Sequence, residues 1–506
     1  MRHSKVDQAK IGFLIKNLRE RRELTQSDFA KALGTSQSAV ARMEAGHQNM
    51  TLEQLSKISE VLDHKIITLS DSVDFRVEGK RKLSGKIRTN FSKNGAIGLI
   101  AAALINKQTT TLGGIPHIEE VLRMMEALES IGVKINWVKK NTLQITPPKK
   151  YALHKINEDA FRKIRVGLYL FGALGKQLTN FSIPHSGGCK MGKRTISAHE
   201  GALRAMGLKI NTTAKNYEVS HNKLHGADIT MLESSDTSTI NALLLAAQIP
   251  ETTILRFVPP NYQVQEVCFF LQKLGVKIEG VGTTNLIITG KNSISKAIAY
   301  ENSEDPIESM MFISAAIMTD SKLTIERCPI DFLRLELEKL KMMGQKFTIS
   351  KPYSAKNGFT SLVDINVYPS KLTALPDKIH SLPYPGINTD NLPFFVPIAT
   401  KAKGTTLIHD WMWENRAVYF TELNRLGAII NLADPHRAFI EGPTELSAAR
   451  VTCPPALRPA MIILIAMLGA KGTSTLHHVY SIKRGYEEIA ERLNAIGAKI
   501  TIITGV

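Results

Sequence analysis

The order of hydrophobic and polar residues repeats six times along the chain after its first seventy positions. Each repeat is an amphipathic helical stretch that ends at a glycine and passes at once into residues with the two-residue period of a strand, as in MEALESIGVKINW. The glycines, separated by 75, 68, 69, 83 and 70 residues, are Gly132, Gly207, Gly275, Gly344, Gly427 and Gly497. Glycine terminates helices readily because its left-handed conformation costs little. Self-similarity at this spacing predicts an α/β architecture built from six βα-type units.

Six units of about seventy residues contain more apolar residues than one hydrophobic core usually holds. We therefore expect two lobes of three units each. A solenoid is less well supported, because units of this length bring enough apolar residues to close into globular lobes. A cleft between two lobes is a common place for a ligand.

The first seventy residues follow a different pattern, which predicts a run of short helices. Thr25 is placed to cap one helix, with Asp28 in the position where a capping box has its acid, and Gly34 ends that helix. A fourth helix is expected from Thr51. Two short helices separated by a turn at a glycine form the helix-turn-helix arrangement.

The stretch LTQSDFAKALGTSQSAVARMEAG, residues 24–46, resembles the phage-repressor-like (XRE) helix-turn-helix family. The resemblance implies that Gln37, Ser38 and Arg42 on the second helix face base edges of double-stranded DNA, and that Gln26 touches the backbone. A helical bundle kept for dimerisation or protein contact is the alternative. Residues 1–70 hold eleven basic and eight acidic residues, a net charge of only +3, so useful affinity for DNA is expected to need a homodimer.

The composition indicates a folded protein with anionic partners. Of the 506 residues, 43% are hydrophobic and 22% are charged, which excludes a disordered chain. The net charge of +18 favours nucleic acid or phosphorylated metabolites as partners, although a solvated basic surface would have the same composition. No apolar run reaches the ~18 residues of a membrane helix and the start has no secretory pattern, so we expect no membrane contact and a cytoplasmic location.

The four cysteines lie far apart, without a C-x-x-C pair or histidines at ligand spacing, so neither a metal site nor a disulfide framework is expected. One of them stands in the loop SGGCKMGKR, where Cys189 lies near Lys190, Lys193 and Arg194. Cationic neighbours stabilise a thiolate, and glycines let an anion approach the backbone closely. We therefore interpret Cys189 as a reactive thiol beside an anion site.

Six motifs stand in order between Val77 and the C-terminus: NFSKNGAIGLIAAAL, HSGGCKMGKR, NTDNLPFF, WENRAVYFTELNRLGA, ALRPAMIIL and SIKRGYEEI. Together with the repeats they resemble the UDP-N-acetylglucosamine enolpyruvyltransferase (MurA) family of enolpyruvyl transferases. The resemblance implies two inverse α/β barrels joined by a two-stranded hinge. The helix-turn-helix domain would then be residues 1–70, one discontinuous lobe 71–92 with 306–506, and the other lobe 93–305, which carries the Cys189 loop.

The same resemblance implies an activity, the transfer of the enolpyruvyl group of phosphoenolpyruvate to the 3-hydroxyl of UDP-N-acetylglucosamine in peptidoglycan precursor synthesis, with no cofactor. Cys189 would protonate C3 of phosphoenolpyruvate and form a transient adduct, Asp390 would act as base, and Lys93 would stabilise developing charge. It also implies that fosfomycin alkylates Cys189.

Two sets of binding residues follow from the resemblance as well. Phosphoenolpyruvate would be held by Lys93, Arg194, Arg416, Arg458 and Arg484, because arginine forks bond phosphate and carboxylate groups bidentately. The acceptor would be held by Asn94, Glu120, Arg165, Ser235, Thr389, Asp390 and Trp413.

The acceptor side departs from the family pattern, whereas the phosphoenolpyruvate side matches it. After Arg194 the chain reads TISA where the family usually has Pro-Val-Asp-Leu, and ESSDTS replaces a KVSVGA loop, so Glu233 stands for a lysine and Asp236 adds a second carboxylate. Asn261 replaces a glutamate and Ala456 an aspartate. Carboxylates facing a diphosphate would weaken its binding through repulsion. Three interpretations stay open. The changes are drift within a working enzyme, or they suit a different acceptor, or catalysis is lost and the protein is a DNA-binding regulator that senses cell-wall precursors.

Overall fold

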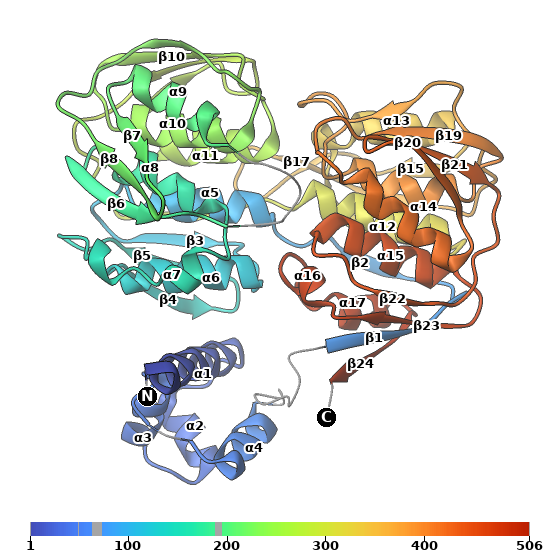
Figure 1. Ribbon diagram of the computed structural model, residues 1–506, viewed down its shortest axis with the longest axis horizontal. Helices are drawn as coiled ribbons and strands as arrows, with labels where there is room; N and C mark the ends of the chain where they lie inside the picture. Colours follow the sequence, from blue (N-terminus) through green and yellow to red (C-terminus); the bar gives the residue numbers. More distant parts are fainter. Residues whose placement is uncertain (1, 49, 63–72, 188–194, 505–506) are drawn as a thin grey trace.

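A computed structural model describes residues 2–48, 50–62, 73–187 and 195–504 (Figure 1). A small helical domain at the N-terminus adjoins a larger body of two lobes, and the chain enters the second lobe before it builds the first. Among the described helices, none combines the length and the apolar character needed to cross a bilayer.

The N-terminal domain consists of four helices, α1 (Arg2–Arg21), α2 (Gln26–Leu33), α3 (Gln37–Glu44) and α4 (Leu52–Val61). The capping box of Thr25 with Asp28 is confirmed, as are the helix end at Gly34, whose φ is 67°, and the helix that starts after Thr51. The buried apolar side chains of this domain form a core of their own, which includes Ile15, Leu18, Phe29, Val40 and Ile58.

The first lobe comprises residues 93–305 and contains three sheets. Its helices are α5 (Lys93–Ala103), α6 (Glu119–Ser130), α7 (Glu158–Phe161), α8 (Leu170–Leu174), α9 (Ser197–Ala205), α10 (Asp236–Ala246) and α11 (Tyr262–Lys273), with the 3₁₀ turns η1 (Leu153–Lys155) and η2 (Val166–Tyr169). Its strands are β3 (Thr110–Gly113), β4 (Lys134–Lys139), β5 (Thr142–Thr146), β6 (Asn180–Pro184), β7 (Lys209–Thr212), β8 (Asn216–Ser220), β9 (Asp228–Thr230), β10 (Thr252–Arg256), β11 (Lys277–Glu279), β12 (Asn285–Thr289) and β13 (Ile298–Glu301).

The second lobe combines two early strands with the C-terminal part of the chain. Its helices are α12 (Pro306–Met318), α13 (Arg334–Met342), α14 (Phe395–Ala399), α15 (Leu457–Gly469), α16 (Tyr480–Lys483) and α17 (Ile489–Ala495), with the 3₁₀ segments η3 (Ile330–Phe332), η4 (Leu392–Phe394) and η5 (Ala417–Leu426). Its strands are β1 (Val73–Glu78), β2 (Lys86–Arg88), β14 (Leu323–Pro329), β15 (Phe347–Ile349), β16 (Tyr353–Ser354), β17 (Ser361–Val367), β18 (Ile379–His380), β19 (Gly404–His409), β20 (Ile429–Asp434), β21 (Arg437–Gly442), β22 (Arg450–Thr452), β23 (Thr473–His477) and β24 (Lys499–Thr504).

The six predicted units are confirmed, and each belongs to a different sheet. All six terminating glycines have positive φ, between 89° and 108°. Each is followed by a strand at the edge of its sheet, in the orders β13-β3-β5-β4, β6-β8-β7, β11-β12-β10-β9, β15-β17-β14-β2, β18-β19-β21-β20 and β22-β23-β1-β24. One unit differs from the prediction, because the helical stretch before Gly427 is the 3₁₀ segment η5. The six described sheets are open, each with two free ends, in a mixed α/β fold.

Two antiparallel chain segments connect the lobes. Ser92 donates its backbone N–H to the carbonyl of Ser303, and Asp305 donates to the carbonyl of Asn90, at 2.8 Å each. β1 pairs with β23 and β24 of the C-terminal part, and β2 pairs with β14. The buried apolar residues form one large cluster in each lobe, beside the core of the helical domain. These clusters support the domain boundaries expected from the sequence, which we retain as a proposal.

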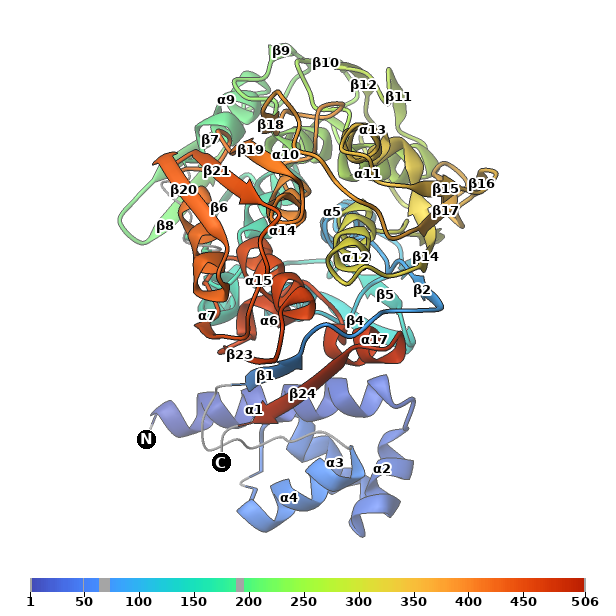
Figure 2. The ribbon, with the colours of Figure 1, turned by 90° about the vertical axis from the view of Figure 1, so that its right-hand side faces the viewer.

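The sheets surround helices that are buried along their whole length. All residues of α12 are buried, as are nearly all of α5, α10 and α15. Such helices carry few charged residues after their first turn. Functional polar side chains are therefore expected at their N-terminal ends. Figure 1 shows α5 in the first lobe and α12 in the second, and Figure 2 looks at the second lobe from its outer side.

Candidate active site

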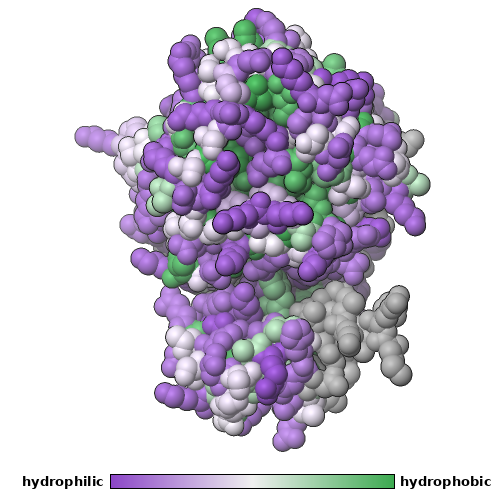
Figure 3. Space-filling model, turned by 90° about the vertical axis from the view of Figure 1, so that its left-hand side faces the viewer, coloured by the Kyte–Doolittle hydropathy of each residue, from purple (hydrophilic) through white to green (hydrophobic). Residues whose placement is uncertain are grey.

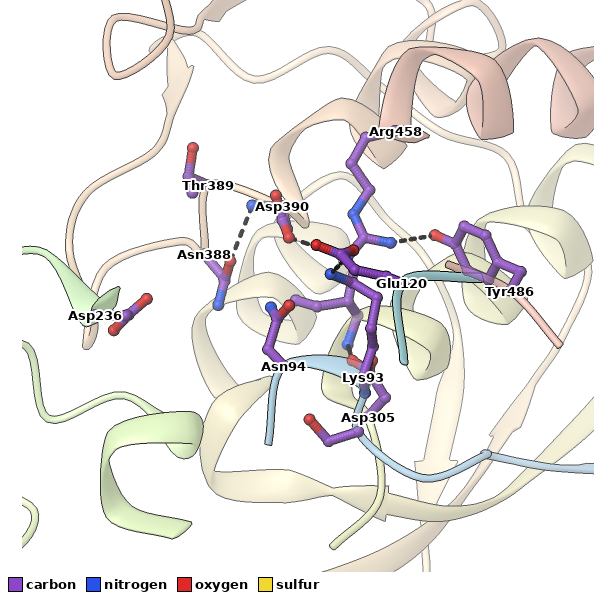
Figure 4. Close-up of polar contacts among 12 residues, drawn as sticks. Lys93, Asn94, Glu120, Asp236, Asp305, Asn388, Thr389, Asp390, Arg458 and Tyr486 are labelled. Atoms are coloured by element: carbon purple, nitrogen blue, oxygen red, sulfur yellow. Dashed lines mark hydrogen bonds and ion pairs between the residues drawn. The ribbon is translucent and has the colours of Figure 1, made fainter. Parts of the chain in front are cut away.

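Several of the predicted site residues, among them Lys93, Asp390 and Arg458, lie where the two lobes face each other, around the start of α5 (Figure 4). Ser92 caps this helix by accepting a hydrogen bond from Gly95 N, so Lys93 is its first residue. The Lys93 ammonium bonds Glu120 Oε2 at 2.9 Å, and both side chains are almost entirely buried. Lys93 N also donates to Asp305 Oδ2 at 3.3 Å, which ties α5 to the cap of α12 in the other lobe.

Glu120 lies among several cations. Burial alone would raise the pKa of this carboxyl, but Lys93, Arg484 and Arg458 hold it below its usual value. The backbone N–H of Glu120 points to the carbonyl of Arg484 at 3.4 Å, so the first turn of α6 lies against the end of α16. Glu120 is therefore an ionised counter-ion at the centre of the cationic cluster.

Asp390 is the second carboxylate of the cluster, and it comes from the opposite lobe. Arg458 in the first turn of α15 donates to Asp390 Oδ2 at 2.9 Å and to the Tyr486 hydroxyl at 2.7 Å. Arg416 Nη1 lies 3.9 Å from Asp390 Oδ1. Burial would raise the pKa of Asp390, but these two guanidinium groups lower it, so the carboxylate is ionised and able to accept a proton.

Arg416 is itself buried, with 1% of its surface exposed. It donates to Asp410 Oδ1 and to the Thr389 carbonyl at 2.7 Å each. Trp413 donates its indole N–H to Thr389 Oγ1 at 2.8 Å, and its ring lies 5.6 Å from the Arg416 guanidinium carbon. The pairing with Asp410 satisfies one edge of the guanidinium and orients it toward Asp390.

Each of three predicted cations, Lys93, Arg416 and Arg458, is thus bonded to a carboxylate. An anionic ligand entering the cluster would replace Glu120 on Lys93 and Asp390 on Arg458, while Asp410 keeps its bonds to Arg416. Such a site can bind phosphate and carboxylate groups and can keep a free carboxylate, that of Asp390, beside them.

The acceptor side is less cationic. Asn94 donates to the Tyr262 hydroxyl at 2.9 Å, and Asn261 donates to Asp236 Oδ2 at 3.0 Å. Asp236 faces the segment Asn388–Asp390 across the space between the lobes (Figure 4). Burial first, and then the charge of Asp390, raise the pKa of the Asp236 carboxyl to about 6. Ser235 precedes α10 and makes no side-chain capping bond with it.

Cys189 and Arg194 lie outside the described residues, and the structure describes only the two flanks of their loop, up to Gly187 and from Thr195. A side chain at Gly187 would clash with the carbonyl oxygen of Arg162, which explains why glycine begins the loop. On the other side Arg165 donates to the carbonyl of Thr195 at 2.8 Å. Burial lowers the pKa of Arg165.

The three other cysteines, Cys268, Cys328 and Cys453, are buried and unpaired, and burial raises the pKa of each thiol to about 12. They are inert at neutral pH, which leaves Cys189 as the candidate nucleophile.

Sequence reasoning missed several partners of these residues. Asp305 stood before Pro306 at a helix start, a detectable capping signal. Asp410 and Tyr486 carried no such signal, because what gives them a role is a neighbour from another part of the chain.

In the N-terminal domain three of the predicted DNA contacts, Gln26, Gln37 and Ser38, stand at the starts of α2 and α3, and Arg42 stands in the last turn of α3. Gln37 donates to Gln26 Oε1 at 2.8 Å, and Gln26 donates to Glu44 Oε2 at 2.8 Å. Ser38 and Arg42 are exposed on α3. Glu44 is held by Arg19 of α1, so the two glutamines are positioned by a buried ion pair.

Comparison with known proteins places both parts of the chain. Residues 77–493 match the family described as EPSP synthase (3-phosphoshikimate 1-carboxyvinyltransferase), and residues 15–65 match the helix-turn-helix family. A UDP-N-acetylglucosamine 1-carboxyvinyltransferase of Bradyrhizobium diazoefficiens is 34% identical over 435 residues, 85% of this chain and 97% of that protein. The enzyme of the same name from Treponema denticola is 33% identical, over 85% of this chain and 99% of that protein.

Solved structures show the same fold. The enolpyruvyl transferase NikO from Streptomyces tendae superposes with a TM-score of 0.74 at 22% identity, covering 86% of this chain and all of that one. EPSP synthase from Acinetobacter baumannii gives a TM-score of 0.66 at 19% identity. The chain therefore belongs to the EPSP synthase family of enolpyruvyl transferases, and it carries a helix-turn-helix domain in front of the transferase fold.

Proposed function

We propose that the chain transfers the enolpyruvyl group of phosphoenolpyruvate to the 3-hydroxyl of UDP-N-acetylglucosamine, and that its N-terminal domain binds double-stranded DNA. The observation that carries the first part is the cluster in which Lys93, Arg416 and Arg458 surround Asp390 between the lobes. It joins groups for an anionic donor to a carboxylate able to take a proton from a hydroxyl. The names of the relatives support the choice of both substrates.

In this proposal phosphoenolpyruvate takes the place of Glu120 on Lys93 and of Asp390 on Arg458, and Arg416 stays fixed by Asp410. Its phosphate group contacts Lys93, Arg194 and Arg484, and its carboxylate contacts Arg416 and Arg458. The developing charge at C2 is stabilised by groups that are already fixed in place before the reaction, which reduces the reorganisation needed in the transition state.

The reaction then proceeds by addition and elimination. Asp390 takes the proton of the acceptor hydroxyl as its oxygen bonds to C2, while Cys189 gives a proton to C3. In the second step Asp390 passes its proton to the departing phosphate as the bond from C2 to the phosphate oxygen breaks with its electron pair. Asp390 then takes a proton from C3, which restores the double bond, and afterwards it loses that proton to solvent while the Cys189 thiolate regains one. Asn94, Glu120, Arg165, Ser235, Thr389 and Trp413 are the proposed contacts of the acceptor or of its neighbours in the site.

Phosphate release from phosphoenolpyruvate by the full-length protein tests this activity. We expect release that depends on UDP-N-acetylglucosamine, and we expect Cys189→Ser to slow it by roughly 10²–10⁴-fold, the usual contribution of a positioned acid. Full activity of the serine variant would contradict the acid role. A Cys189 peptide left unmodified after exposure to fosfomycin would contradict the reactive thiol.

A second candidate is favoured by the carboxylate of Asp236 beside Asn261 on the acceptor side. A protein that binds phosphoenolpyruvate but releases no phosphate with UDP-N-acetylglucosamine would use a different acceptor, or would be a DNA-binding regulator that senses its ligand without converting it. Calorimetry with each ligand separates these outcomes from a protein that binds neither.

A further inference from the structure

The N-terminal domain accounts for little of the positive charge, since residues 1–70 contribute only +3 of the +18. One segment of the first lobe is far more basic. Residues 131–157 contain six lysines and one histidine and have no aspartate or glutamate. The six are Lys134, Lys139, Lys140, Lys149, Lys150 and Lys155, which we call the lysine face.

The lysine face is exposed, and no described carboxylate pairs with it. All six side chains are exposed. Within the part of the chain that the structure describes, none of the six is recorded with a carboxylate in ion-pairing range, whereas the nearest arginines are paired: Arg123 with Glu119 and Glu126, and Arg162 with Glu158. Unpaired ammonium groups in this number form a surface of positive potential.

The lysine face lies next to the helix-turn-helix domain. Lys16 of α1 approaches Glu129 at 3.7 Å, and Glu129 stands near the end of α6, five residues before Lys134. β4 is the edge strand of its sheet and the strand of this lobe nearest to α1 (Figures 1 and 2). Figure 3, which views the side of the first lobe, shows a mostly hydrophilic surface directly above the N-terminal domain.

Protection of a sheet edge explains only part of this pattern. Lysines on an edge strand discourage pairing with another chain, and Lys134 and Lys139 lie on β4. Lys149, Lys150 and Lys155 follow β5 and belong to no strand, so edge protection gives no reason for them. A long polyanion that passes both the helix-turn-helix domain and this lobe would give these three lysines a role that edge protection does not.

We infer that the lysine face binds the phosphate backbone of DNA that extends beyond the segment held by the helix-turn-helix domain. This inference rests on the proposed DNA binding. Duplex DNA carries one negative charge per ~1.7 Å of its axis, so a row of lysines can follow it without reading its sequence. The lysine face would thus supply affinity, and α3 would supply base contacts.

The test compares two full-length variants that lose the same charge. One has all six lysines of the lysine face changed to glutamine. The control has six exposed lysines of the second lobe changed to glutamine, namely Lys322, Lys346, Lys351, Lys356, Lys371 and Lys378. Affinity for a duplex of about forty base pairs is measured by fluorescence anisotropy between roughly 50 and 200 mM salt.

We expect the lysine-face variant to bind at least about tenfold more weakly at low salt and to show a salt slope smaller by roughly 2 to 5, since each lost phosphate contact removes ~0.9. The control variant keeps the slope of the unaltered protein. The difference disappears on a duplex of about twelve base pairs, which is little longer than the single helical turn occupied by one half-site. Equal slopes for the two variants, or equal losses on short and long duplexes, would overturn the inference.

A third variant, with Gln37 and Arg42 changed to alanine, separates this inference from the proposed role of α3. If it binds DNA as well as the unaltered protein while the lysine-face variant does not, the proposed base contacts are wrong and the lysine face stands. If it loses DNA binding while the lysine-face variant behaves like the control, the proposed base contacts stand and the lysine face does not bind DNA. No binding of the unaltered protein to any duplex overturns both, and lysine-dependent binding to phosphatidylserine vesicles alone would assign the surface to a membrane.

Discussion

At the scale of single residues, the acceptor side of the site departs from the family pattern through the carboxylate of Asp236. Asp236 accepts a hydrogen bond from Asn261 and faces Asp390 across the lobes, and burial raises the pKa of its carboxyl to about 6. Above that pH two carboxylates border the space that a UDP-sugar would enter. Charge at position 236 should therefore control how well a diphosphate is tolerated.

We predict that Asp236→Asn lowers the KM for UDP-N-acetylglucosamine by roughly three- to tenfold at about pH 8, because it removes a repulsive charge of order 1 kcal/mol. The effect should shrink at about pH 5.5, where the carboxyl of the unaltered protein, with its pKa raised to about 6, is largely protonated. Asp228→Asn, an exposed change in the same lobe at a residue paired with Arg256, is the control and leaves the KM unchanged. Weaker binding by Asp236→Asn would contradict the repulsion and would show that the acceptor donates a hydrogen bond to this carboxylate.

The sequence predicted which residues of the site would be neighbours better than it predicted how they would pair. Lys93, Asp390, Arg416 and Arg458 were expected together from motifs in different parts of the chain, and the fold brings them together. Pairing of Lys93 with Glu120, and of Arg458 with Tyr486, depends on the approach of α6 and of the segment after α16, which no local pattern specifies. Their roles in binding and catalysis stay predictions until the activity is measured.

At the scale of elements, features that depend on residues close in the sequence were predicted correctly. Features that depend on contacts between distant segments could not be predicted. The six helix–glycine–strand units, the capping box at Thr25 and the helix end at Gly34 follow from backbone preferences within a few residues. The 3₁₀ form of η5 and the sheet to which each strand belongs depend on distant partners. β1, for example, precedes its partners β23 and β24 by about four hundred residues, a pairing that periodicity cannot reveal.

The stability of the fold around Glu129 in α6 should fall as the pH rises. Burial, together with the charge of Glu20, raises the pKa of Glu129 to about 7, although Lys16 opposes the shift. The folded form thus holds a proton on Glu129 between the unfolded pKa and about 7, so the contribution of this group to stability is greatest below that window and is lost as the pH rises through it.

We predict that Glu129→Gln increases the free energy of unfolding at about pH 8 by roughly 1 to 3 kcal/mol and flattens its pH dependence between about 5.5 and 8. Urea denaturation at several pH values measures both effects. Glu158→Gln, at an exposed pair with Arg162, is the control and should change neither by more than about 0.5 kcal/mol. A pH profile that is the same in the Glu129→Gln variant would show that another group titrates.

A second element contact joins the lobes away from the charged cluster. Phe359, between β16 and β17 of the second lobe, stacks on Phe269 of α11 with ring centroids 4.1 Å apart and planes at 5°. Nearby, Asn357 donates to Glu266 Oε1 at 3.2 Å. We predict a coupling free energy of roughly 0.5 to 1.5 kcal/mol between the two rings, measured by a double-mutant cycle with Phe269→Ala and Phe359→Ala. Strictly additive effects of the two changes would mean that the stack does not hold the lobes together.

At the scale of the whole molecule, α6 is the element that touches both functional parts. Its first turn presents Glu120 to Lys93, and near its end Glu129 meets Lys16 of α1. A helix of twelve residues is short enough to move as one rigid piece. Phosphoenolpyruvate that replaces Glu120 on Lys93 would change the forces on the first turn of α6, and any resulting shift would reach α1.

We therefore predict that binding of phosphoenolpyruvate with UDP-N-acetylglucosamine changes the DNA affinity of the protein by roughly five- to a hundredfold, the usual range for linked sites. By thermodynamic linkage, DNA must then change the affinity for the two ligands by the same factor, which calorimetry and anisotropy measure independently. Lys16→Gln removes the contact with Glu129 without touching either ligand, so it should bring both factors toward one. If both changes in affinity are the same in the Lys16→Gln variant as in the unaltered protein, the coupling runs through another contact. Factors of one in the unaltered protein would mean that the two domains share a chain but act separately.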